Sequence, residues 1–219
     1  METIPNNRLF IVDNSLAHDK QWLIELFTAM KPLKKKWVSH PLMDDDQVLK
    51  LAAEAGCWYV YQAVFDTSDV IKNGIKRLRD HGIGVEGTIL LGTDDHDEYE
   101  IKTLVDFLVQ INLDLAEFTI LTPFPKSHIR KKYKKENRII SNNWIEYTCD
   151  NVVFQPKKMS AEKLKQLYNY AWDTFYADGG YQTRMGELFF KVIKQEILDG
   201  TYRKYNPREK RSFKKAVNQ

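Results

Sequence analysis

The feature that most constrains the fold of this 219-residue chain is the apolar run 83–91, which lies between two glycines. Gly82 follows a helical pattern, at the place where a positive φ is usual and glycine adopts it without strain. The run is apolar and rich in β-branched residues, with small residues at Gly84, Gly87 and Thr88. It is typical of a central parallel strand that is buried on both faces. The internal glycines indicate either a ligand close to the backbone or tight packing against a neighbour.

Strand-like and helix-like segments alternate on both sides of this run, and such alternation predicts βα units and a parallel sheet. Five units of this kind favour an open partial barrel or an open sheet, because five strands cannot close an eight-stranded barrel. We expect strands at 8–12, 37–40, 57–65, 83–91 and 116–121, and helices at 18–30, 44–55, 68–81, 98–112 and 127–137.

The pattern changes after residue 141. A short cover segment precedes two helices, one capped by Ser160 and one over about 182–198, and a basic tail follows. The sequence therefore predicts three parts: an α/β unit over 1–140, a cover segment with helices over 141–200, and a tail over 201–219.

Composition excludes some classes of protein. With 43% hydrophobic and 29% charged residues, wholesale disorder is not expected. The net charge of +3 and the scattered basic clusters favour a solvated surface over a nucleic-acid site. The sequence shows no long apolar run and no signal peptide, so we expect a cytoplasmic protein without a membrane span. The two cysteines form neither a disulfide framework nor a metal motif.

Ligands of parallel α/β proteins bind at the carboxyl ends of the strands, where this sequence places several polar residues. His40 is either an acid, base or ligand, or a structural hydrogen-bonding group. Asp13 either caps a helix or contacts a ligand. Glu86 lies within the apolar run, where an unpaired carboxylate is costly, so it is a weak candidate for a functional group.

Several segments together resemble the radical S-adenosylmethionine (radical SAM) proteins that carry a cobalamin-binding domain. The likeness includes Ala55-Gly56-Cys57 and Leu121-Thr122-Pro123-Phe124-Pro125, and it covers about residues 8–177. The other segments that carry it are 11–14, 31–39, 78–85, 113–120, Trp144, Tyr147 and 152–160. This resemblance implies an incomplete (β/α)6 partial barrel that lacks its first strand and is followed by a helical extension. It also implies S-adenosylmethionine and a [4Fe-4S] cluster as cofactors.

The chain departs from the pattern of that family at several positions. The first strand and its Cys-x3-Cys-x2-Cys loop are absent, and Cys57 and Cys149 cannot replace three converging thiolates. No metal ligand is therefore assigned. Phe65 stands where the family usually has a glutamate, and Lys126 where a glycine is common. The residues that match the cofactor pocket of the family are Ser39, Gly87, Thr88, Leu121, Thr122 and Pro123, with Asp13 and Glu86 as weaker candidates.

Two hypotheses of function follow from the resemblance. In the first, the chain is a fragment or subunit of a radical SAM enzyme, and a second chain supplies the cysteine loop and a cobalamin domain. In the second, it is a catalytically inactive, degenerate barrel that serves as a binding or scaffold module, or a gene remnant. Independent catalysis with its own cluster is a third reading, which two cysteines make difficult.

Overall fold

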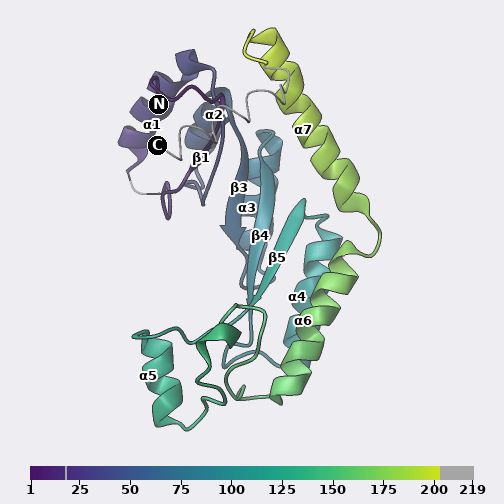
Figure 1. The fold of residues 1–219 in the computed structure, drawn as a ribbon. Coiled ribbons are helices and arrows are strands. Elements are labelled where there is room, and N and C mark those ends of the chain that lie inside the picture. The colour runs from purple at the N-terminus through teal and green to yellow at the C-terminus, as the bar shows by residue number, and fades with distance from the viewer. Residues whose placement is uncertain (18, 203–219) are drawn as a thin grey trace, which may run out of the picture.

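Five strands pair in parallel and in sequence order in the computed structural model, which describes residues 1–17 and 19–202 (Figure 1). The strands are β1 (Arg8–Ile11), β2 (Lys36–Ser39), β3 (Cys57–Ala63), β4 (Gly84–Leu91) and β5 (Leu115–Ile120). The parallel alternation of strands and helices that the sequence predicts is present. The segments predicted as strands lie within two residues of the observed ones, and the largest difference is at β3, which ends at Ala63.

Helices connect the strands and follow the last of them. They are α1 (Lys20–Met30), α2 (Asp46–Glu54), α3 (Asp69–Asp80), α4 (Glu98–Gln110), α5 (His128–Lys135), α6 (Ala161–Tyr176) and α7 (Gly180–Leu198), with 3-10 turns η1 (Lys31–Leu33) and η2 (Trp144–Glu146). Side-chain caps start most of them, because Asp and Ser oxygens accept the free N–H groups of a first turn. Ser160 caps α6 as predicted, and Asp97 with Glu100 forms a capping box at α4.

The prediction of an incomplete (β/α)6 partial barrel is wrong. The strands form one open sheet in the order β1-β2-β3-β4-β5, so β1 and β5 are its two edges. Alternation of strands and helices is common to open parallel sheets and to barrels, so it does not determine whether a sheet closes. The fold is an open five-stranded parallel α/β sheet with alternating helices.

The two faces of the sheet differ, which corrects the expectation that the 83–91 run is buried on both sides. Val85, Ile89 and Leu91 are at most 1% exposed and pack into the core beneath the helices. The alternate positions Glu86 and Thr88 are only partly buried, and Leu90 is 44% exposed. The sheet therefore has one face in the core and one open face, as its period of two residues allows.

The last two helices cover different parts of the sheet. Helix α6 packs beside α4 and β5, and the Tyr176 hydroxyl donates a 2.6 Å hydrogen bond to the carbonyl of Ala116 (Figure 1). The core continues into α6, although the predicted division at residues 140 and 200 remains a prediction. The predicted basic tail lies outside the described residues from position 203 onward.

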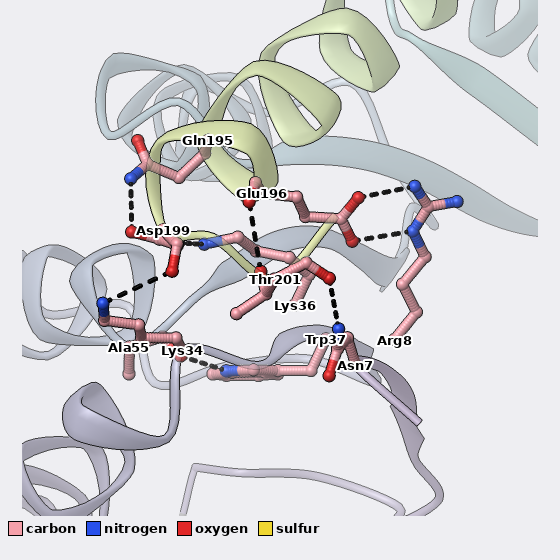
Figure 2. A network of polar contacts seen from close by, with 10 residues as sticks. All are labelled: Asn7, Arg8, Lys34, Lys36, Trp37, Ala55, Gln195, Glu196, Asp199 and Thr201. Carbon is pink, nitrogen blue, oxygen red and sulfur yellow. Dashed lines mark hydrogen bonds and ion pairs between the residues drawn. The ribbon is translucent and has the colours of Figure 1, made fainter. Parts of the chain in front are cut away.

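Helix α7 crosses the amino ends of the strands and is fixed there by ion pairs (Figure 2). Glu196 is 2% exposed and accepts two hydrogen bonds from Arg8 of β1, at 2.9 and 2.7 Å. Asp199, just after α7, lies 3.0 Å from the buried ammonium group of Lys36 in β2. These contacts hold α7 against the amino ends of β1 and β2, whereas the carboxyl ends of the strands lie at the opposite edge of the sheet.

Candidate functional site on the open face of the sheet

Three rings gather on the open face across β1, β2 and β3. Phe10, His40 and Tyr61 lie with their ring centroids 5.6 Å apart in each of the three pairs. Phe10 and Tyr61 reach this face because alternate strand residues point to the same side, and His40 follows β2 directly. Phe10 is 49% exposed, so this aromatic cluster is accessible from solvent. His40 is therefore part of an aromatic surface, and among the residues that the structure describes it belongs to no group of His, Cys, Asp or Glu side chains that could hold a metal ion.

Two carboxylates lie next to the aromatic cluster, on β4 and β5. Glu86 is opposite Tyr61 in the parallel register, and Glu117 is opposite Thr88. Burial raises the pKa of Glu86, a 3.0 Å hydrogen bond from the Tyr59 hydroxyl lowers it, and the charge of Glu117 raises it again. Neither glutamate forms an ion pair within residues 1–17 and 19–202. The open face thus combines aromatic rings with uncompensated negative charge.

The same carboxylates act on Tyr61. Burial raises the pKa of its phenol, and Glu86 and Glu117 raise it further. The hydroxyl therefore keeps its proton and remains a hydrogen-bond donor at neutral pH. A cationic group placed between these side chains would relieve the mutual repulsion of the two glutamates.

Of the residues predicted from the sequence, Glu86 and Thr88 lie on this open face, and Gly87 does not. A Cβ on Gly87 would point into the core, 2.6 Å from Leu113 Cδ2. The absence of a side chain there is explained by packing of the sheet against its helices. Of the two readings of the glycines, tight packing therefore accounts for Gly87.

The remaining predicted residues are distributed around the carboxyl edge. Ser39 is fully buried and donates a 2.8 Å hydrogen bond to the carbonyl of His40. Thr122 is 7% exposed and donates to the carbonyl of Ile120 at 2.9 Å. Pro123 is buried, Leu121 is half-buried, and Asp13 is exposed beyond β1. Leu121, Thr122 and Pro123 directly follow β5, whereas Ser39 ends β2 and Asp13 follows β1. A ligand role for these residues remains a prediction.

Sequence reasoning missed Phe10, Tyr61 and Glu117. Their signal was present in the sequence as alternate positions on neighbouring strands. Reading that signal requires the strand register, which places Tyr61 opposite Glu86 and Glu117 opposite Thr88. The register depends on tertiary packing and is not encoded in any one strand.

A cavity of about 480 Å³ opens at the carboxyl edge, beside this face. It is lined by the loop after β3, by the end of β4 and by the first turns of α4. Parallel α/β proteins bind ligands at this edge, and the volume is in the range of about 300–1,000 Å³ typical of small-molecule sites.

The residues do not fit the iron–sulfur cluster that the resemblance implied. Within residues 1–17 and 19–202, no three His, Cys, Asp or Glu side chains come together to hold a metal ion. Cys57 is buried in the core, where burial raises the pKa of its thiol, and it forms no pair with Cys149. The described residues therefore provide no ligand set for such a cluster.

Comparison with known proteins finds similarity to proteins named as methyltransferases. No protein-family model matches the chain. It is 26% identical over 179 residues to the bacteriochlorophyllide d C-12(1)-methyltransferase of Chlorobaculum tepidum, covering 74% of this chain and 39% of that protein. It is 24% identical over 182 residues to an uncharacterized methyltransferase of Pyrococcus horikoshii, covering 75% of this chain and 40% of that protein. The chain thus spans about two-fifths of the length of these curated relatives.

One solved structure has a similar fold. It is the radical S-adenosylmethionine methyltransferase TsrM of Kitasatospora setae, determined with cobalamin and a [4Fe-4S] cluster bound. The TM-score is 0.52 at 13% identity, over 75% of this chain and 37% of that one. At this identity the likeness concerns the fold alone.

These findings correct the identity inferred from the sequence. The two curated relatives described above are named as methyltransferases, and neither name mentions a radical reaction or a cluster. The assignment to the cobalamin-type radical SAM proteins is therefore wrong, as are the iron–sulfur and cobalamin attributes and the function as a fragment of such an enzyme. The alternative of an inactive scaffold gains no support. Of the two expected cofactors, the methyltransferase relatives support S-adenosylmethionine and not the cluster.

The sequence predicted no membrane span, and the lengths and compositions of the helices bear on that expectation. In the part of the chain that the structure describes, no helix is both long enough and apolar enough to cross a bilayer.

Proposed function

We propose that the open face of the sheet binds S-adenosylmethionine, and that this chain is the methyl-donor-binding part of a methyltransferase. The observation that carries the proposal is the aromatic cluster of Phe10, His40 and Tyr61 beside the unpaired carboxylates of Glu86 and Glu117. The methyltransferase names of the curated relatives support the reaction class.

The chemistry of the donor matches this surface. S-adenosylmethionine carries a positive sulfonium and a flat adenine ring. Aromatic faces attract cations and stack with planar rings, for about 0.5–1 kcal/mol at accessible sites. Glu86 and Glu117 supply negative charge that attracts the sulfonium. Glu86 is partly buried, which weakens the screening of its charge by solvent, whereas Glu117 is exposed. The expected arrangement places adenine at the aromatic cluster and the sulfonium over β4 and β5.

The step that the donor undergoes is a group transfer. The methyl group leaves the sulfonium for an electron-rich atom of the acceptor. The sulfur keeps the pair of electrons of the broken bond and becomes the neutral thioether of S-adenosylhomocysteine. The acceptor releases a proton to solvent, so charge and atoms balance. Glu86 and Glu117 stabilise the charged donor, whereas the neutral product loses that attraction and dissociates more readily.

We propose binding, and not turnover, for the chain alone, because it spans about two-fifths of the curated relatives. The proposal includes a second chain that would complete the enzyme.

The test is equilibrium dialysis with labelled S-adenosylmethionine. Glu86→Gln keeps an acceptor for the Tyr59 hydroxyl and removes the charge, so the sheet should fold normally. We expect the affinity to fall about five-fold, or about 1 kcal/mol. Glu25→Gln, on the exposed side of α1, is the matched control and should leave the affinity unchanged. An equal affinity in the wild type and Glu86→Gln would remove Glu86 from the site.

A further inference from the structure

The cavity at the carboxyl edge has walls that expose large aromatic surfaces. Phe65 in the loop after β3 is 69% exposed, and Tyr99 in the first turn of α4 is 77% exposed. Leu90 of β4 and Leu104 of α4 complete the apolar lining. Exposed aromatic side chains beside a cavity of about 480 Å³ favour a ligand that has a flat apolar body.

His96 lines the cavity, and a hydrogen bond to one of its ring nitrogens determines which tautomer it adopts. The backbone N–H of Gly92 donates to Nδ1 of His96 at 3.2 Å. The neutral ring therefore carries its proton on Nε2. Burial lowers the pKa of His96, which favours this neutral form, although the surrounding Glu100 and Asp95 oppose the shift. His96 thus presents an N–H group, and a ligand would meet it with an oxygen or nitrogen acceptor.

The charge of the lining selects against anions. Asp66 and Asp95 both line the cavity, from the loops after β3 and β4. Asp66 accepts one hydrogen bond from the backbone N–H of Ser68, at 2.9 Å, and has no cationic partner among the described side chains. Glu100 also lines the cavity but is engaged in the capping box of α4 and lies 3.3 Å from Lys158. A neutral or cationic ligand fits this balance, whereas a carboxylate or phosphate would be repelled.

The cavity adjoins the proposed donor site along a single strand. Glu86, Thr88 and Leu90 point to the same face of β4, and Leu90 also lines the cavity. Two residues of a strand span about 7 Å, so a ligand in the cavity lies within reach of a methyl group held over Thr88.

We propose that this cavity binds the methyl acceptor, a planar, neutral or cationic ring compound with a hydrogen-bond acceptor that meets His96. The role as acceptor site rests on the proposed function, whereas the preference for such a ligand rests on the cavity itself. Phe65 and Tyr99 hold the ring, and Asp66 and Asp95 exclude anions.

The test uses the neutral planar dye Nile red and the anionic dye 1-anilinonaphthalene-8-sulfonate, with fluorescence as the readout. We expect saturable Nile red binding that weakens at least five-fold in Phe65→Ala and in Tyr99→Ala. Phe190→Ala removes an aromatic side chain of α7 that is 68% exposed, and it should leave binding unchanged. Because all three side chains are exposed, thermal melting should confirm that each variant folds.

The outcomes separate this inference from the proposed function. Equal Nile red affinity in the wild type and both cavity variants would overturn the site, as would tighter binding of the anionic dye at Phe65 and Tyr99. Displacement of Nile red by S-adenosylmethionine would also overturn it, because the two ligands should bind together. If the dye behaves as expected and S-adenosylmethionine does not bind at all, the cavity remains a ligand site, and its role as acceptor site fails with the proposed function.

Discussion

The contact between Arg8 and Glu196 allows a quantitative prediction about how α7 is fixed to the sheet (Figure 2). The two partners differ in exposure, since the side chain of Glu196 is 3% exposed and that of Arg8 is 45% exposed. Truncating either partner removes the same two hydrogen bonds. The two truncations leave different unpaired charged groups, so they should lower the free energy of unfolding by different amounts.

Arg8→Met leaves a buried carboxylate without a partner, which costs about 3 kcal/mol of unfolding free energy. It also removes the guanidinium from the Phe189 ring, whose centroid lies 4.8 Å away. Glu196→Met leaves a guanidinium that solvent can reach, so the cost falls to about 1 kcal/mol. The double variant leaves no unpaired charge and should also lose about 1 kcal/mol, far less than the two single losses together.

Urea unfolding of the four proteins measures these differences as a double-mutant cycle. For a chain of this size, the loss in Arg8→Met corresponds to a melting temperature lower by roughly 6–12 °C. Equal losses in the two single variants, or an additive double variant, would refute the reasoning. Equal losses would show that the difference in exposure does not set the cost, and an additive double variant would show that Arg8 and Glu196 are not energetically coupled.

Three further predictions concern other parts of the fold. Gly87→Ala should lower the unfolding free energy by about 1–3 kcal/mol, because its Cβ has no space in the core, whereas Gly186→Ala in α7, which meets no atom within 4 Å, should raise it by about 0.5–1 kcal/mol in the same urea titration. Hydrogen bonds from neighbouring cations, the Arg138 guanidinium first, hold the pKa of Asp94 below its usual value. The stability that Asp94 contributes is present above its unfolded pKa of about 3.9 and is lost as the pH falls through the folded value, so unfolding curves should show Asp94→Asn less stable than wild type at pH 6, with the gap closing below about pH 3. Burial raises the pKa of the Cys57 thiol, so a thiol reagent should modify Cys149 in the folded protein and Cys57 only after unfolding.

The sequence predicted the elements well because each carries a local signal. Ser160 capped the helix it was expected to cap, and the apolar run 83–91 coincides with β4. Packing between distant segments decides whether the sheet closes into a barrel or stays open, and which face of β4 is exposed. The alternation of Val85, Ile89 and Leu91 with Glu86, Thr88 and Leu90 was visible in the sequence, but the interleaved small residues obscured it.

The candidate site was predicted only in part for a similar reason. Glu86 stood out because a carboxylate in an apolar run is unusual, and it does lie on the open face. Phe10, Tyr61 and Glu117 each look ordinary within their own strand, and only the register brings them beside Glu86. The family resemblance did not predict the chemistry, because short apolar motifs of βα units recur in proteins with different chemistry.

The difference in affinity between S-adenosylmethionine and S-adenosylhomocysteine tests the central claim most directly. The two ligands share adenine, ribose and the amino acid, and they differ in the methyl group and the positive charge on sulfur. If Glu86, Glu117 and the aromatic cluster recognise that charge, isothermal titration should show S-adenosylmethionine bound about five- to ten-fold more tightly, and Glu86→Gln should remove most of the difference. Equal affinities in the wild type, or a preference for S-adenosylhomocysteine that Glu86→Gln leaves unchanged, would contradict the account.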